Sequence, residues 1–287
     1  MNVLLFLIIA IVVLLSTALI TIHLGFRAPR NREQGTPKDI GIEYRQLHIP
    51  THAGKQLFGW LLPNNNASET LIILHGWGAN AELMLPIAVP FHHAGMNVLL
   101  FDARSHGQSS SDTFSSLPRF AEDLGEVIDW LKLNYPEKSE KIALLGHSVG
   151  AGAVLFECSK RNDIQAVISL SSFAHPAWVM QRYLKHFRIH APVRMLVMRY
   201  VEWVIGYRFA SFAPLDTVCK IQCPVLLVHG KCDTTVPVED ARAIMANCPK
   251  PDLSLLEIED AGHDSVDKIE EHGSELVAFL RKSGFRV

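Results

Sequence analysis

Residues 146–150 place a serine where it could act as a nucleophile. They read Gly-His-Ser-Val-Gly and put Ser148 between an apolar run and a segment of small residues typical of a helix start. This context fits a nucleophile elbow, a strand-to-helix turn so tight that only glycine fits two residues before and after the serine. His147, inside the turn, is expected to shape the elbow rather than act as a base. A glycine-flanked serine alone is also compatible with a simple tight turn, so the interpretation depends on the partners that a serine nucleophile needs.

Those partners are a general base and a carboxylate that orients it. Asp233 follows one apolar run and His263 follows the next, which gives the chain order serine, acid, histidine. Both would lie at the same sheet edge as Ser148. We therefore predict Ser148 as the nucleophile, Asp233 as the acid and His263 as the general base. Asp260 and Asp264 are the alternative acids.

Acyl transfer also needs N–H groups that point at the developing oxyanion. Val149 supplies the first, because it follows the nucleophile and opens a helix whose positive end faces the charge. Residues 75–78, His-Gly-Trp-Gly, follow another apolar run, and we assign the second donor to the N–H of Trp77. No cofactor or metal is expected, since no His-Glu-x-x-His motif is present. Residues 146–152 also lack the Gly-Lys-Ser/Thr ending of a phosphate-binding loop.

The elements that position these residues follow from the apolar runs. Residues 42–49 and 55–62 flank a turn and predict an antiparallel hairpin. Further strands are expected at residues 70–75, 97–101, 141–146, 165–170, 224–229 and 253–258, separated by helix-length stretches such as 117–134 and a C-terminal helical stripe through 266–280. The sequence therefore predicts the α/β class: a mostly parallel eight-stranded sheet with an N-terminal antiparallel hairpin, helices on both faces and a short helical cap.

An uncharged apolar run occupies residues 3–24. At about 1.5 Å per residue, a helix of this length crosses the roughly 30 Å of a bilayer's hydrocarbon core. A cleaved secretory signal is the alternative, but no basic residue precedes the run and its apolar core is longer than a signal peptide needs. We expect a transmembrane anchor at 1–26, a linker at 27–40 and the catalytic domain at 41–287. Basic residues that follow the run predict a cytoplasmic domain: Arg27, Arg30, Arg32 and Lys38.

The candidate cap is an insertion at about 172–213, too long for an ordinary connection between a strand and a helix. Its only acidic side chain is Glu202, whereas its basic side chains are Arg182, Lys185, Arg188, Arg194, Arg199 and Arg208. Either the cap covers the sheet edge with its charges in solvent, or its basic face lies against anionic lipid headgroups. In the second case aromatic side chains are available to line an acyl pocket: Trp178, Tyr183, Phe187 and Trp203.

Composition excludes some partners. The formal net charge of −2 gives no global basic field, so we expect no nucleic-acid partner. The five cysteines show neither Cys-x-x-Cys nor zinc-site spacing, and we interpret them as reduced thiols. Reduced thiols agree with a cytoplasmic domain.

Taken in order, five segments resemble the α/β-hydrolase superfamily. They are residues 75–78, residues 102–109, the elbow, the Asp233 segment and residues 261–263, and the resemblance covers about residues 42–285. Ser105 stands where the family often has glycine, and we interpret the 102–109 loop as structural. The short cap and the anchor are similar to membrane-anchored esterases and thioesterase-like members grouped with serine aminopeptidases. Relatives with an aspartate nucleophile are disfavoured because Ser148 occupies that position.

The residues and the resemblance together favour hydrolysis of a carboxylic ester or thioester through an acyl-serine intermediate, on a small acyl substrate that is lipid-like and near the membrane. A serine peptidase of the aminopeptidase type would use the same groups to cleave an amide. A membrane-anchored interaction protein that kept the fold but lost turnover is the third alternative.

Overall fold

A single eight-stranded sheet organises the molecule. The computed structural model describes residues 3–65 and 67–287. Within these residues the strands are β1 (Arg45–Thr51), β2 (Lys55–Leu62), β3 (Glu69–Leu74), β4 (Asn97–Phe101), β5 (Lys141–His147), β6 (Ala166–Leu170), β7 (Val225–Gly230) and β8 (Leu253–Ile258). They lie in the order β1-β2-β4-β3-β5-β6-β7-β8. The β1–β2 and β2–β4 pairs are antiparallel and the others are parallel. The predicted fold class is confirmed.

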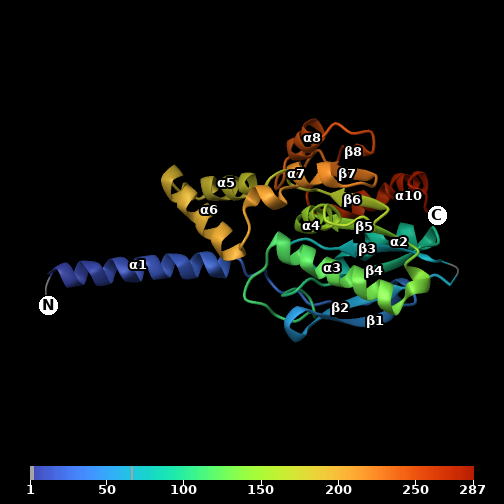
Figure 1. The fold of residues 1–287 in the computed structure, drawn as a ribbon, viewed down its shortest axis with the longest axis horizontal. Helices are drawn as coiled ribbons and strands as arrows, with labels where there is room; N and C mark the ends of the chain where they lie inside the picture. Colours follow the sequence, from blue (N-terminus) through green and yellow to red (C-terminus); the bar gives the residue numbers. More distant parts are fainter. Residues whose placement is uncertain (1–2, 66) are drawn as a thin grey trace.

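Helices cover both faces of this sheet (Figure 1). The helices are α1 (Val3–Gly25), α2 (Leu85–His93), α3 (Leu117–Asn134), α4 (Val149–Cys158), α5 (Pro176–His186), α6 (Ala191–Ile205), α7 (Pro214–Thr217), α8 (Val238–Asn247), α9 (Val266–Glu271) and α10 (Gly273–Lys282). One layer consists of α2, α9 and α10, and the other contains α3, α4, α7 and α8. The sheet thus lies between two helical layers.

The continuous apolar runs are explained by this burial on both faces. In β3, Ile72 and Leu74 point into the core beneath α3 and α4, whereas Leu71 and Ile73 point into the core beneath α2 and α10. All four side chains are buried. Successive residues of a strand point to opposite faces, so a central strand covered on both sides needs an apolar residue at every position.

The C-terminal stripe forms two helices rather than one. Helix α9 ends at Glu271 and α10 begins at Gly273, with His272 between them. A Cβ atom at position 273 would approach Cγ of Pro90 to 2.6 Å, so this glycine lets the chain pass directly against α2. The apolar positions continue through the break because both helices cover the same face of the sheet.

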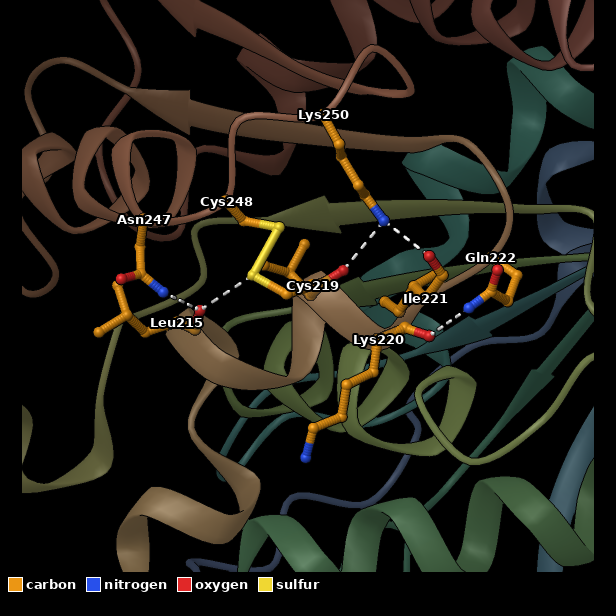
Figure 2. The surroundings of a disulfide bond; sticks show 9 residues. Leu215, Cys219, Lys220, Ile221, Gln222, Asn247, Cys248 and Lys250 are labelled. Atoms are coloured by element: carbon orange, nitrogen blue, oxygen red, sulfur yellow. Dashed lines mark hydrogen bonds between the residues drawn. A yellow bond between two sulfur atoms is a disulfide. The ribbon is translucent and has the colours of Figure 1, made fainter.

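The prediction of reduced thiols is wrong for two cysteines. Cys219 and Cys248 form a disulfide with their Cα atoms 5.5 Å apart, within the usual range for such a bond (Figure 2). Cys219 precedes β7 and Cys248 follows α8, so the bond joins the two ends of a strand-helix unit that folds back on itself. A separation of 29 residues matches no local motif, so the spacing does not reveal the pair. Cys158, Cys223 and Cys232 are free thiols.

Helix α1 projects away from the sheet, and α5 and α6 reach out on the same side of the molecule (Figure 1). The segment Leu5–Gly25 has the length and apolar composition of a membrane span. A small apolar cavity is lined by Ile22, His23 and Phe26 together with residues of α6, from Tyr200 to Ile205. The end of α1 therefore lies against the candidate cap.

Candidate active site

Ser148 occupies a strained turn between β5 and α4. Its backbone has φ 54° and ψ −114°, a conformation that residues other than glycine rarely adopt. A Cβ atom at Gly146 would overlap the carbonyl of Gly150, and one at Gly150 would overlap the carbonyl of His75. The tight packing therefore requires both glycines, and the turn has the geometry of a nucleophile elbow.

The structure brings the three side chains predicted for catalysis into one hydrogen-bonded chain. His263 Nε2 lies 2.9 Å from Ser148 Oγ, and His263 Nδ1 lies 2.7 Å from Asp233 Oδ2. An ionised carboxylate only accepts hydrogen bonds, so Nδ1 carries the proton and Nε2 is free to accept from the serine hydroxyl. Strands β5, β7 and β8 are parallel, which puts the loops that follow them at one edge of the sheet. Asp233, rather than Asp260 or Asp264, meets the histidine.

Asp233 is held as a carboxylate. Its Oδ1 accepts from the N–H groups of Thr235 at 2.9 Å and Val236 at 2.7 Å. His229 Nε2 lies 3.4 Å from Oδ2 and 2.8 Å from the carbonyl oxygen of Val236. Burial would raise the pKa of Asp233, but the hydrogen bonds from His229, His263 and Val236 outweigh burial and hold that pKa below its usual range. No role was predicted for His229 from the sequence, although this residue stands in the same segment as Asp233.

His147 contacts the loop that carries His263. Its Nε2 donates to the backbone carbonyl of His263 over 2.8 Å. Burial lowers the pKa of His147, so the ring is kept neutral. The elbow residue therefore also ties the serine turn to the His263 loop, a contact across 116 residues that the sequence did not reveal.

A metal-ligand cluster would have to use the same groups. His147, His263 and Asp264 lie close enough for their donor atoms to share an ion. Both ring nitrogens of His263 already face Ser148 and Asp233, and Nε2 of His147 faces a carbonyl. The arrangement is thus organised for proton transfer along His263.

Val149 and the loop that carries Trp77, the predicted oxyanion donors, lie next to the serine turn. The loop after β3 packs against the elbow, since a Cβ atom at Gly76 would lie 3.2 Å from Ser148 Cβ. Val149 is the first residue of α4. Neither the N–H of Trp77 nor that of Val149 donates a hydrogen bond to any residue that the structure describes. Unpaired amides beside a nucleophile are available to bind a negatively charged oxygen.

The 102–109 loop has the contacts of a structural element. The buried Asp102 accepts from the N–H groups of Ala81 and Gln108, each at 2.8 Å. Ser105, at the position where glycine is frequent in the family, has φ 68° and so adopts the left-handed conformation that glycine favours. The loop braces the segment after residue 78 without touching Ser148 or His263 through any hydrogen bond among the described residues.

The cap charges are partly paired within the protein. Arg182 makes two hydrogen bonds of 2.9 Å to the buried Asp240. Glu202 accepts from Arg208 at 3.0 Å and lies 3.8 Å from Arg199. The basic excess available to an outside partner is therefore smaller than the sequence suggests.

The four cap aromatics do not enclose an acyl pocket. Tyr183 of α5 and Phe187, the residue that follows this helix, pack edge to face with ring centroids 4.9 Å apart. Trp178, Tyr183, Phe187 and Trp203 are all exposed, and Trp203 is 77% accessible. These side chains therefore face solvent instead of a pocket.

A cavity of about 400 Å³ lies beneath the end of α6. Its lining contains a charged cluster around Asp112, which forms ion pairs with Lys55 at 2.8 Å, Arg119 at 3.2 Å and Arg104 at 3.4 Å. The lining contains none of the residues predicted for catalysis. A charged wall of this kind does not suit an acyl chain.

The chain is similar in sequence to known proteins. A family model described as serine aminopeptidase, S33, matches residues 65–206. The uncharacterized protein YqkD of Bacillus subtilis is 29% identical over 224 residues, which is 74% of this chain and 72% of the relative. The uncharacterized membrane protein YNL320W of Saccharomyces cerevisiae is 23% identical, covering 87% of this chain and 84% of that protein.

The chain is also similar to solved structures. The esterase Pf2001 of Pyrococcus furiosus superposes with a TM-score of 0.74 and 29% identity, covering 89% of this chain and 98% of the esterase. Est1E of Butyrivibrio proteoclasticus, solved with ferulic acid bound, has a TM-score of 0.65 and 22% identity, with 81% and 98% coverage. At that lower identity the second match speaks for the fold alone.

Proposed function

Because the chain belongs to the α/β-hydrolase superfamily, we propose that it is a serine hydrolase that cleaves a carboxylic ester or thioester through a covalent acyl-serine intermediate. The observation that carries the proposal is the hydrogen-bonded chain from Ser148 Oγ through His263 to Asp233, with distances of 2.9 and 2.7 Å. Nucleophile, base and orienting acid are the groups that acyl transfer requires.

In the first half of the proposed reaction, Ser148 Oγ attacks the substrate carbonyl carbon while its proton passes to His263 Nε2. Asp233 stabilises the resulting imidazolium through Nδ1–H. The carbonyl oxygen becomes an oxyanion and accepts hydrogen bonds from the N–H groups of Trp77 and Val149. Collapse of this intermediate expels the alcohol or thiol, which takes the proton from His263 and leaves an acyl-serine.

In the second half, water attacks the acyl-serine. His263 accepts a proton from that water, and a second oxyanion forms in the same position. Its collapse returns the proton to Ser148 Oγ and releases the carboxylic acid. No cofactor takes part in either half.

We favour esters over amides as substrates because a solved relative that covers 89% of this chain, Pf2001, is an esterase. The second candidate is amide cleavage, favoured by the serine aminopeptidase description of the matching family model. The third is a non-catalytic membrane-anchored protein, which the intact hydrogen-bonded chain argues against.

We further propose that the substrate bears a lipid-like acyl group and is drawn from the bilayer that α1 crosses. The end of α1 lies against α6. On α6, Leu196 is 67% exposed and Trp203 is 77% exposed, and a spacing of seven residues puts both on one face of the helix. An exposed apolar face beside a membrane span suits insertion at the lipid interface. Lys185 and Arg188 would meet the headgroups.

Two features bear on which side of the membrane the catalytic domain lies. The basic residues after α1 favour a cytoplasmic domain, whereas the disulfide between Cys219 and Cys248 is of a kind that persists in oxidising compartments. We retain the cytoplasmic placement. A membrane-impermeant maleimide applied to intact cells tests it at the exposed thiol of Cys232. Protection until the cells are lysed supports the cytoplasm, and labelling of intact cells places the domain outside.

A substrate panel tests the proposed activity. Full-length protein in phospholipid vesicles is offered acyl esters, acyl thioesters and aminoacyl amides, each with short and long acyl groups, and Ser148→Ala is the control. We expect turnover of esters or thioesters that the control lacks. Turnover of the amides alone would make the peptidase the correct assignment, and no turnover of any substrate would favour the non-catalytic protein.

A further inference from the structure

The segment that follows α1 lies on the loop that carries one of the proposed oxyanion donors. Asn31 Nδ2 donates to the carbonyl of Gly78 over 2.8 Å, and Asn80 Nδ2 donates back to the carbonyl of Asn31 over 3.2 Å. These two bonds clamp the chain on either side of Ala79. Gly78 directly follows Trp77, whose N–H is the proposed donor. We call residues 29–35 the strap and residues 75–81 the oxyanion loop.

Packing supplements the hydrogen bonds at Gly78. This residue has φ 71°, and a Cβ atom there would come within 2.8 Å of Cγ of Pro29. Gly78 is buried, whereas Pro29 and Asn31 lie on the surface. The strap therefore covers the oxyanion loop at Gly78, where Pro29 stands in the way of outward movement.

The C-terminal part of the strap is also fixed. The N–H groups of Gln34 and Gly35 donate to the two carboxylate oxygens of Glu82 over 2.6 and 2.9 Å. Glu33 accepts from Gln108 Nε2 over 2.9 Å. These contacts join the strap to Glu82, the residue that follows the oxyanion loop, and to the 102–109 loop, which itself holds the N–H of Ala81 through Asp102.

The N-terminal end of the strap is tied to the anchor. Only residues 26–28 separate α1 from Pro29. The carbonyl of Phe26 accepts from the N–H of Ser115 over 2.9 Å, and the Phe26 side chain lies against α6. The residues expected to form a plain linker are therefore an ordered connection between the candidate membrane span, the cap and the oxyanion loop.

From these contacts we propose that the strap positions the oxyanion loop for catalysis, so that the membrane-anchored N-terminus is a working part of the active site. The inference rests on the proposed acyl-transfer function. Asn31 acts as a positioning residue: it holds Gly78, and through it the orientation of the neighbouring amide of Trp77. A displaced donor stabilises the oxyanion less, because such hydrogen bonds depend steeply on geometry.

Replacement of Asn31 tests the proposal in the full-length protein. Loss of a whole oxyanion donor lowers kcat by roughly 10² to 10³, so a loosened donor in Asn31→Ala is expected to lower kcat for a small soluble ester by roughly ten- to a hundredfold. KM should change less than threefold. Affinity for an alkyl boronic acid, whose tetrahedral serine adduct places an oxygen in the oxyanion hole, should fall by the same factor as kcat/KM.

Asn247→Ala is the matched control. Its side-chain amide also donates to a backbone carbonyl, that of Leu215 over 2.9 Å, and this bond involves neither the strap nor the oxyanion loop. This control should keep wild-type kcat and boronate affinity. Pro29→Gly serves as a second strap variant, and thermal melting checks that each variant is folded.

The outcomes separate this inference from the proposed function. Folded Asn31→Ala and Pro29→Gly proteins with kcat and boronate affinity within twofold of wild type would overturn the role of the strap while leaving the hydrolase intact. A wild-type protein that neither turns over esters nor binds the boronate at Ser148 would overturn the proposed function, and this inference with it.

Discussion

At the scale of single residues, the proposed chemistry depends on side chains whose protonation state and orientation are determined by their hydrogen-bond partners. His263 has one nitrogen toward Asp233 and the other toward Ser148, so its protonation at Nδ1 is dictated by an acceptor that cannot donate. Asp233 in turn is kept ionised by surrounding donors, including the N–H of Val236. The orientation of the imidazole is therefore fixed before any substrate arrives, which is the condition for efficient general base catalysis.

Asp233→Asn tests that orientation. An amide in place of the carboxylate presents a donor to Nδ1 and favours the wrong histidine tautomer, so kcat for a preferred ester should fall by about 10⁴ at neutral pH, as such replacements do in other serine hydrolases. Asp264→Asn, at the exposed neighbour of His263, should change kcat less than threefold. Steady-state kinetics on both folded variants provide the measurement. A large loss in Asp264→Asn with little loss in Asp233→Asn would make Asp264 the acid.

At the scale of elements, the sheet edge and the cap have different proposed roles. The loops after β5, β7 and β8 carry Ser148, Asp233 and His263, the groups proposed to react, and the parallel strands bring these loops to one edge of the sheet. Helices α5 and α6 are less constrained, with Val201 the only α6 side chain in the core among those the structure describes. The cap is thus free to serve a surface function that the sheet cannot.

A charge on the outer face of α6 tests the proposed contact with lipid. Leu196→Glu should lower turnover of a long-chain ester embedded in vesicles by roughly thirtyfold, because burial of a leucine is worth about 2 kcal/mol and burial of a carboxylate is unfavourable. Turnover of a short soluble ester should stay unchanged. Leu133→Glu is the matched control, since Leu133 is 81% exposed on α3. Equal effects of the two substitutions on the embedded ester would argue against a membrane-facing cap.

The disulfide is expected to stabilise the region around β7. It closes a loop of 29 residues, and the chain-entropy relation assigns such a loop about 3 to 4 kcal/mol of stabilisation. Cys219→Ser should lower the free energy of unfolding by about that amount under non-reducing conditions. Chemical denaturation with and without a reducing agent measures it: reductant should destabilise the wild type and leave the variant unchanged. A wild type indifferent to reductant would mean that the bond contributes nothing.

At the scale of the whole molecule, buried neutral histidines link stability to pH. Burial, aided by the neighbouring His106, lowers the pKa of His75 to about 3, and burial lowers the pKa of His106 to about 4. Both values lie below the ordinary 6.5 of an unfolded chain, so the unfolded state binds more protons below that pH. The contribution of these two histidines to stability is fully present above about pH 6.5 and is lost as the pH falls toward their pKa values in the folded protein.

This linkage predicts a measurable loss on mild acidification. Between pH 7 and pH 5, each histidine should lower the free energy of unfolding by about 2 kcal/mol. This follows from a loss of about 1.4 kcal/mol per pH unit below pH 6.5. Chemical denaturation at the two pH values measures the loss. His106→Gln removes one titrating group and should reduce the difference by about 2 kcal/mol. An unchanged difference in this variant would show that His106 is not responsible.

The sequence predicted what local patterns encode. The limits of β2, β4, β8 and α3 follow from apolar runs and helical periodicity, and the elbow follows from its glycines. Contacts between distant segments could not be predicted from the sequence. The bond from Asn31 to Gly78 spans 47 residues and that from His147 to the His263 carbonyl spans 116. No periodicity records such contacts, because they arise only when the sheet order brings separate loops to one edge.

The central claim, that Ser148 is an activated nucleophile, is tested most directly by covalent labelling with a fluorophosphonate. The reagent reacts with a serine hydroxyl only when a base removes its proton and the oxyanion site accepts the phosphoryl oxygen. Mass spectrometry of the labelled full-length protein should find one adduct, on Ser148, that is absent from Ser148→Ala and forms far more slowly in His263→Ala. A folded wild-type protein that takes up no label, or takes it up equally well in both variants, would contradict the account.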